Sequence, residues 1–533
     1  MAGIEQAVLG SVLDTNGERA ICRFGREVLQ TSRKLAEGDH PAAVSVGGLV
    51  KIAVSGRLLF GTLSDLTADR DDANSVVATV EYMGEGPCGP DGNVLQFRRG
   101  LSLYPQPGDP VQFASTEDLR RIYAPPELPH IQIGTVYPTQ DVRAPVLFDM
   151  LMGRHFAVLG SSGTGKSTTV TMMLDRIIQK AAHGHVVILD PHGEYAKAFG
   201  SAAQVWDVGN LQLPYWAMNL EEHCEAFITS GDEHRTVDAN ILAKCLLKAR
   251  TRNIQFGDTT KFTPDSPISY QLSNLIDALE EEAGKLERLA DSHRYTQLRL
   301  TIEQFFHDRR YRFIFNPEFA SHSLEKLLGD LLRIPVADKP ISIIDLAGVP
   351  TEIINVVVST LTRMILDYAI WAPREQRKPV LLVCEEAHRY LPRVRSTVTR
   401  SVERQLERIA REGRKYGVCL GLVTQRPSEL SETALSQCGT ILSMRLNNLN
   451  DQAQLRACMS EGARAMVDVI ATLKNRECVI SGDGVPVPMR VLIDTVAEDR
   501  KPASDDPVFS TSWSQDAGAE LLNETVNRWR KER

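Results

Sequence analysis

The chain has 533 residues, of which 43% are hydrophobic and 24% are charged, and its formal net charge at pH 7 is −8. These values are typical of a globular protein of about three domains. They exclude a generally basic nucleic-acid coat, so DNA binding would require positive charge concentrated on one surface or channel. No apolar run is long enough for a membrane-spanning helix, and the first six residues do not resemble a secretory signal. We therefore expect a cytoplasmic protein without a membrane partner.

The nine cysteines occur singly, with no Cys-x-x-Cys pair. Such spacing argues against a zinc site and against a disulfide framework. A reducing compartment is consistent with it.

The first 125 residues are predicted to form a small β-barrel. Between residues 7 and 115, stretches rich in β-branched residues alternate with turn clusters such as Gly84-Glu85-Gly86-Pro87, as in a barrel or sandwich. This region contains no P-loop, metal-ligand set or nucleophile–base pair, so we interpret it as a module for assembly or partner docking. The proline-bearing stretch at 124–129 is the expected linker.

From about residue 131 the pattern alternates strands and helices, which predicts an α/β fold with a mostly parallel sheet. We assign 131–212 and 336–498 to this core, 213–335 to a helical insertion and 499–533 to a C-terminal tail. Within the insertion, Ser266-Pro267 has the features of a helix start. The tail ends in an amphipathic stretch that could pack on a neighbour. The expected strands are 155–159, 185–190, 341–345, 380–384, 417–424, 438–445 and 477–481.

A glycine-rich stretch follows the first of these strands and opens a helical pattern. Strand, glycine-rich loop and helix in this order are the context of a phosphate-binding P-loop. Backbone N–H groups would surround the phosphates of ATP, and the helix N-terminus would add partial positive charge. Lys166 would reach the β- and γ-phosphates, and Ser167 would hold Mg²⁺. The predicted nucleotide-binding residues are Gly160, Ser161, Ser162, Gly163, Thr164, Gly165, Lys166, Ser167 and Thr168.

Two carboxylates follow the apolar strand at 380–384. Glu385 occupies the position of a magnesium-binding Walker B residue, acting through water, and Glu386 would polarise the attacking water. Many NTPases have Asp where Glu385 stands. Gln425 follows another apolar strand, where its amide could sense the γ-phosphate or could be an ordinary strand-end group.

The stretch from Asp190 to Tyr195 follows the second strand. Asp190 and Glu194 could face the nucleotide, or they could organise a structural turn. We expect His192 to be structural, because no partner set for a metal is visible.

The segment from Arg393 to Lys415 holds a cationic helical stripe beside an apolar stripe of Val402, Leu406 and Ile409. It could be a solvated face neutralised by pairs such as Glu407 with Arg411. It could instead supply arginine fingers to a neighbouring subunit or contacts to a DNA backbone. The candidate DNA contacts are Arg393, Arg395 and Arg400.

Several separated motifs together resemble the HerA family of HerA–FtsK ATPases. They are Ile133-Gly134-Thr135, the P-loop with its strand, Asp190 to Tyr195, Leu213-Pro214-Tyr215-Trp216, Glu385-Glu386-Ala387-His388, Arg411 to Gly417, and Thr424-Gln425-Arg426-Pro427. The resemblance implies a hexameric ring with a RecA-like ATPase core, an N-terminal barrel of the HAS type and a helical insertion.

The resemblance also implies which residues of this chain have the family's functional roles. The resemblance implies that Lys166 is the catalytic lysine, Glu386 the Walker B glutamate and Gln425 the sensor. Trans-acting arginines would be Arg154 and Arg411, with Arg414 a competitor for the second place.

The resemblance further implies translocation on double-stranded DNA through the ring, together with a separate effector such as the nuclease NurA or, in bacterial antiviral defence, a sirtuin-like NADase. The leading hypothesis is therefore an ATP-driven, Mg²⁺-dependent DNA translocase. The alternative is an assembly hub, in which ATP sets the state of a scaffold for the effector without processive translocation. Neither the effector nor a choice between DNA repair and defence can be identified from the sequence.

Overall fold

A computed structural model of the chain describes residues 8–27, 46–137, 139, 141–229, 232–252, 259–285, 289–394, 400–459, 461–503, 509–514, 516 and 518–532. The chain forms two compact units. The first comprises residues 1–186, 369–396 and 406–498, and the second comprises 187–368, 397–405 and 499–533. No helix among the described residues combines the length and apolar character needed to cross a membrane.

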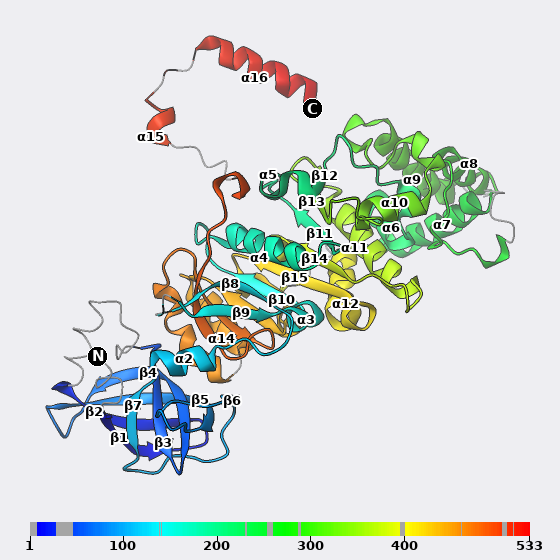
Figure 1. Cartoon of the computed structure of the whole chain (residues 1–533). Helices are drawn as coiled ribbons and strands as arrows, with labels where there is room; N and C mark the ends of the chain where they lie inside the picture. The colour runs from blue at the N-terminus through cyan, green and yellow to red at the C-terminus, as the bar shows by residue number, and fades with distance from the viewer. Residues whose placement is uncertain are drawn as a thin grey trace. The chain divides into compact units, whose positions relative to one another are not determined.

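The first unit begins with the expected β-barrel, drawn in blue in Figure 1. Its sheet has the order β2-β1-β7-β3-β4-β5-β6, and an additional β2–β5 pairing closes six of these strands into a barrel. Along β2 every second side chain is buried, as the two-residue period of a strand requires. The strands are β1 (Val8–Thr15), β2 (Arg19–Gly25), β3 (Leu49–Val54), β4 (Arg57–Ala68), β5 (Ser75–Pro87), β6 (Arg98–Arg99) and β7 (Pro110–Phe113).

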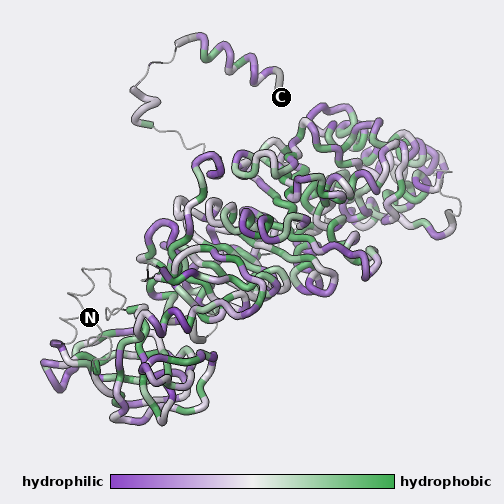
Figure 2. Tube along the Cα trace, viewed as in Figure 1, coloured by the Kyte–Doolittle hydropathy of each residue, from purple (hydrophilic) through white to green (hydrophobic). Residues whose placement is uncertain are grey.

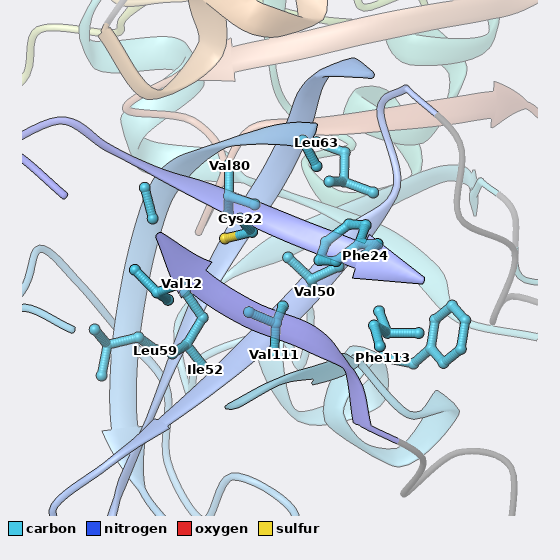
Figure 3. Close-up of a cluster of buried hydrophobic side chains, with 13 residues drawn as sticks. Val12, Cys22, Phe24, Val50, Ile52, Leu59, Leu63, Val80, Val111 and Phe113 are labelled. Atoms are coloured by element: carbon cyan, nitrogen blue, oxygen red, sulfur yellow. The ribbon is translucent and has the colours of Figure 1, made fainter. Parts of the chain in front are cut away.

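The inward-facing side chains form one apolar cluster in the barrel, which Figure 3 shows in close-up. Phe24, Cys22 and Val80 are fully buried in it. Burial raises the pKa of the Cys22 thiol to about 12, so this cysteine acts as a small apolar side chain. The barrel therefore has a core of its own.

The rest of the first unit contains a sheet in the order β14-β15-β10-β16-β17-β18-β8-β9. Strands β14, β15, β10 and β16 are parallel, and the pairings from β16 outward are antiparallel. The expectation of a mostly parallel sheet therefore holds only for one part of it. The strands are β8 (His130–Val136), β9 (Arg143–Leu147), β10 (Phe156–Leu159), β14 (Val380–Cys384), β15 (Val418–Thr424), β16 (Thr440–Ser443), β17 (Glu477–Gly482) and β18 (Met489–Ile493).

The β17–β18 pairing is antiparallel because the connection between these two strands is short. Only six residues join β17 to β18, which is too short for the crossover that parallel strands need. The chain therefore folds back as a hairpin.

Helix α3 (Phe148–Gly153) precedes β10, and α4 (Lys166–Lys180) follows it and buries Val170, Met173 and Leu174.

The second unit contains the strand order β12-β13-β11, with β12 (Ala203–Trp206) parallel to β13 (Ile341–Asp345). Strand β11 (His185–Asp190) lies where the first unit passes into the second. The insertion is helical, as expected. Its helices are α6 (Leu220–Phe227), α7 (Asp232–Thr251), α8 (Leu272–Ala283), α9 (Leu289–His307) and α10 (Leu324–Leu332).

The predicted helix start at Ser266-Pro267 is wrong, because α8 begins at Leu272. The Ser266 hydroxyl accepts a hydrogen bond from the Thr263 N–H at 3.0 Å, and the Ser266 carbonyl accepts one from Ile268 at 2.8 Å. Ser266 thus serves a turn instead of capping a helix.

The remaining helices are α2 (Thr116–Ile122), α5 (Tyr195–Phe199), α11 (Ile354–Trp371), α12 (Arg400–Tyr416), α13 (Glu432–Ser436), α14 (Leu449–Cys458), α15 (Phe509–Ser512) and α16 (Ala519–Glu532). Hydrophobic and hydrophilic residues alternate along α16, and its Leu522 and Trp529 are 68% and 60% exposed (Figure 2). The predicted amphipathic stretch of the tail thus lies on a helix with exposed apolar side chains.

Candidate nucleotide-binding site

The loop of residues 160–167 joins β10 to α4 and is held by the strands beside it. Ser161 donates its N–H to the carbonyl of Arg445 at 2.9 Å, just beyond β16, and Gly160 donates to Thr424 of β15 at 3.3 Å. Gly165 has φ +100° at the N-cap of α4, a conformation that favours glycine. No side chain caps this helix start. The backbone thus presents a helix N-terminus of the kind that binds phosphate.

Lys166 begins α4 and is 8% exposed. Its Nζ donates to the carbonyl of Ser161 at 3.2 Å, and the Thr164 hydroxyl donates to the same carbonyl at 2.8 Å. The ammonium group is thereby folded back over the loop that would enclose phosphates. Ser167 and Thr168 lie in the first turn of the same helix.

The two predicted carboxylates lie directly after β14, with Glu385 3% and Glu386 6% exposed. Strand β14 pairs in parallel with β15, which pairs in parallel with β10. Because the carboxyl ends of parallel strands meet at one edge, Glu385, Glu386 and Gln425 lie at the same edge as the glycine-rich loop. The Gln425 amide donates to Oε1 of Glu386 at 2.9 Å.

His388 contacts Glu386 and was not assigned a role from the sequence. Its Nδ1 lies 2.9 Å from the Thr424 hydroxyl and 3.2 Å from Oε2 of Glu386. Glu386 has φ +48°, an uncommon conformation for a residue with a side chain. Such outliers cluster at functional sites. Gln425 thus holds one oxygen of the Glu386 carboxylate by a hydrogen bond, and His388 lies within ion-pair distance of the other.

The three candidate arginines lie at the opposite edge of these strands. Arg154 precedes β10, a four-residue strand that separates it from the glycine-rich loop by roughly 13 Å at 3.3 Å per residue. Arg411 and Arg414 lie in the last turns of α12, just before β15 begins. None of the three is at the edge that holds the loop and the carboxylates.

His155 connects these arginines to the sheet. Its Nδ1 accepts the Leu420 N–H at 2.9 Å, and its Nε2 lies 3.1 Å from the carbonyl of Ala410, next to Arg411. The ring is 3% exposed, and burial together with the nearby Arg414 lowers its pKa. The neutral ring therefore donates through Nε2 and ties α12 to β15.

The cationic stripe of α12 is partly neutralised. Arg408 pairs with Glu412 at 3.4 Å, and Arg411 pairs with Glu407 at 3.0 Å. The predicted apolar stripe is confirmed, because Val402, Leu406 and Ile409 are fully buried. Of the candidate DNA contacts, Arg393 pairs with Glu432 at 2.6 Å. Arg395 and the side chain of Arg400 lie outside the described residues.

Asp190 organises a turn in the second unit. Its carboxylate accepts the N–H groups of His192 at 3.2 Å and Tyr195 at 2.9 Å. Burial raises its pKa, and Asp345 acts in the same direction. These bonds support the structural interpretation, while the catalytic one stays a prediction. The described residues contain no group of three or more His, Cys, Asp or Glu side chains that could hold a metal ion.

Residues 131–365 match the family model described as the central domain of helicase HerA. The DNA double-strand break repair helicase HerA of Sulfurisphaera tokodaii is 28% identical over 441 residues, or 80% of each chain. The protein of the same name from Sulfolobus acidocaldarius is 26% identical over 465 residues, or 86% of each chain. Over most of its length the chain is therefore similar to the HerA helicases.

The fold agrees with this similarity. The structure of VirB4 of Thermoanaerobacter pseudethanolicus superposes with a TM-score of 0.51 at 15% identity, covering 69% of this chain and 97% of that one. The α/β fold with a RecA-like P-loop core is confirmed. Together with the similarity to the HerA helicases, this fold identifies the chain as an ATP-hydrolysing enzyme of the helicase type.

The sequence did not predict two further residues that contact the glycine-rich loop. The Arg476 N–H donates to the carbonyl of Thr164 at 3.1 Å, and the Arg445 carbonyl accepts from Ser161. Arg445 follows β16, the last of the parallel strands, and Arg476 precedes β17, the first antiparallel one. Of the residues that were missed, only His388 could have been found from the sequence, because it follows Glu386 by two residues.

Proposed function

We propose that this HerA-like ATPase is a motor that couples ATP hydrolysis to translocation along double-stranded DNA. The observation that carries the proposal is the separation of the site between two edges of one set of strands. The glycine-rich loop, Glu386 and Gln425 lie at one edge, and Arg154, Arg411 and Arg414 lie at the other. A neighbouring copy would bring the second edge to the first, so a homo-hexameric ring is the assembly that we propose.

At the nucleotide, each side chain has a distinct task. Lys166 neutralises charge on the β- and γ-phosphates, and the N–H groups of residues 160–168 bind phosphate oxygens. Glu386 orients and polarises the attacking water, while Gln425 and His388 hold its carboxylate in place. An arginine from the adjacent subunit compensates charge that develops on the γ-phosphate.

The Ser167 hydroxyl and the Glu385 carboxylate are hard oxygen donors of the kind that Mg²⁺ prefers. The buried Glu385 carboxylate, directly after β14, fits a metal held through water. When bound, Mg²⁺ neutralises phosphate charge.

The barrel of residues 1–125 is proposed as the docking module for a separate effector, a nuclease or an NADase, in DNA-end processing or antiviral defence. The core of 131–212 and 336–498, the insertion of 213–335 and the tail of 499–533 remain the proposed domain division. The relatives named as double-strand break repair helicases support the DNA substrate.

One observation favours the alternative of an ATP-switched assembly hub. Arg393, the candidate DNA contact whose side chain is described, is already paired with Glu432. A hub would need no basic channel lining.

ATP turnover with and without linear duplex DNA tests the proposal. The motor should be stimulated by DNA, and the stimulation should fall steeply with salt, because a chain of charge −8 can hold DNA only through a local basic lining. Lys166→Ala should abolish turnover. Turnover that depends on Lys166 but ignores DNA at every salt concentration would favour the hub.

A further inference from the structure

Arg99 joins the barrel to the loop of residues 482–486, which begins at the end of β17. From β6, its guanidinium donates to the carbonyls of Pro486 at 2.5 Å, Val485 at 2.7 Å and Gly482 at 3.2 Å. Guanidinium donors have a fixed planar geometry, so three such bonds determine where this loop lies relative to the barrel. All of these residues belong to the first unit.

The same loop contacts Arg154, one of the candidate trans-acting arginines. The carboxylate of Asp483 forms an ion pair with the Nη1 of Arg154. The backbones are joined as well, because the Asp483 N–H donates to the Gly439 carbonyl at 2.8 Å and the Gly439 N–H donates to the Arg154 carbonyl at 2.7 Å. A Cβ on Gly439 would lie 2.8 Å from the Cβ of Arg154, so this close approach requires glycine. Asp483 is therefore fixed beside Arg154.

The ion pair is weak enough to open. The side chains of Arg154 and Asp483 are 41% and 43% exposed, and exposed pairs contribute little stability. Burial lowers the pKa of Arg99, and the Asp483 carboxylate opposes that shift. The negative charge of Asp483 is thus attracted both to Arg99 of the barrel and to Arg154. While the pair is closed, the charge of Arg154 is compensated within its own subunit.

We propose that Asp483 is a positioning residue that holds Arg154 in a resting ion pair, and that Arg99 couples this hold to the barrel. A contact that moves the barrel against the 482–486 loop would change how readily Arg154 is released to a neighbour's nucleotide. The inference rests on the proposed function, in which Arg154 acts on that nucleotide.

The hold can be measured without turnover, by the rate at which phenylglyoxal modifies Arg154 in the full chain, followed by peptide mass spectrometry. Asp483→Asn should raise this rate about two- to fivefold, the range expected for opening an exposed pair. Arg99→Ala should raise it in the same direction. Asp141→Asn is the matched control, because it breaks the exposed Arg120–Asp141 pair, which does not include Arg154. An unchanged rate in Asp483→Asn, or in Arg99→Ala, overturns the proposal.

Steady-state ATPase kinetics separate positioning from a structural role. Asp483→Asn should raise kcat about two- to fivefold at unchanged KM, and it should have no effect in an Arg154→Ala background. If Asp483→Asn changes kcat equally in the wild-type and Arg154→Ala backgrounds, Asp483 does not position Arg154. If ATP turnover were the same in the wild type and in Lys166→Ala, the proposed function would be contradicted. The phenylglyoxal modification rates would still decide whether Asp483 and Arg99 hold Arg154.

Discussion

At the residue scale, the site depends on the different surroundings of two adjacent carboxylates. Glu386 contacts Gln425 and His388. Glu386 also has the uncommon backbone conformation. These features support the proposed water-polarising role of Glu386, and Glu385 is the proposed residue for Mg²⁺.

Glu386→Gln should reduce ATP turnover by at least about a hundredfold, the lower range for general acid–base groups, while leaving ATP affinity nearly unchanged. The amide keeps the shape of the carboxylate but cannot polarise water as well. Single-turnover hydrolysis and fluorescent-ATP binding measure the two effects. If Glu385→Gln is inactive and Glu386→Gln turns over normally, the two roles are exchanged.

His223 makes the stability of the second unit depend on pH. It is fully buried, with Nδ1 2.7 Å from the Asn219 carbonyl and Nε2 2.9 Å from the Tyr270 hydroxyl. Burial, assisted by Arg250, lowers its pKa to about 3. Between about pH 6.5 and pH 3 the unfolded chain binds a proton that the folded chain does not, so stability falls as the pH falls.

The unfolding free energy should therefore decrease by up to about 1.4 kcal/mol per pH unit below pH 6.5 because of His223. Urea titrations followed by fluorescence report on this unit, because Trp216 is buried in it. In His223→Gln, which cannot charge, this part of the slope should disappear. A wild-type slope identical to that of His223→Gln would contradict the assignment.

At the element scale, sequence patterns predicted the elements whose signals are local. Strands β10, β13 and β14 and the apolar face of α12 follow from runs and periods of apolar residues. The β17–β18 hairpin did not, because an apolar strand pattern does not reveal strand direction. The start of α8 did not, because Ser266 bonds Thr263 and Ile268 in a local turn instead of capping a helix. The close approach of Arg476 to Thr164 was missed because these two residues are distant in the chain.

The barrel contains a buried ion pair that ties β3 to α2. The Lys51 Nζ donates to Asp118 at 2.8 Å and to the Gly92 carbonyl at 2.9 Å, and Asp118 also accepts the Val94 N–H at 2.8 Å. Both side chains are nearly inaccessible, so removing one partner leaves an uncompensated buried charge.

Lys51→Met should destabilise the barrel by about 3–5 kcal/mol, the usual cost of breaking a buried pair from one side. Hydrogen exchange of the β3 amides measures the loss. Arg120→Met is the control, because it removes the exposed partner of Asp141 and should cost less than about 1 kcal/mol. Equal losses in the two variants would show that Lys51–Asp118 contributes no more than a surface pair.

At the scale of the whole molecule, the proposed motor requires active sites that form between copies. Lys166→Ala removes the lysine from the nucleotide-binding edge of the site. Arg411→Ala removes an arginine from the opposite edge. Each variant alone should be inactive or nearly so, since a supplied arginine is worth about 10³–10⁵ in rate in well-studied phosphoryl transfers. Mixed rings should recover activity, because some interfaces then contain two intact edges.

Subunit exchange between the two variants, followed by ATPase assay, measures this recovery, and mass photometry should show a particle of six 59.1 kDa chains. No recovery despite demonstrated exchange would exclude Arg411, and Arg154 or Arg414 would then be tested in the same way.

Whether the chain moves along DNA is tested most directly by displacement of a third strand from a DNA triplex on a linear duplex. A translocating motor strips the third strand as it passes, without needing to separate the duplex. We predict ATP-dependent displacement by the wild type and none by Lys166→Ala. ATP hydrolysis at full rate on the same DNA, with the triplex left intact, would contradict translocation and leave the assembly hub as the better account.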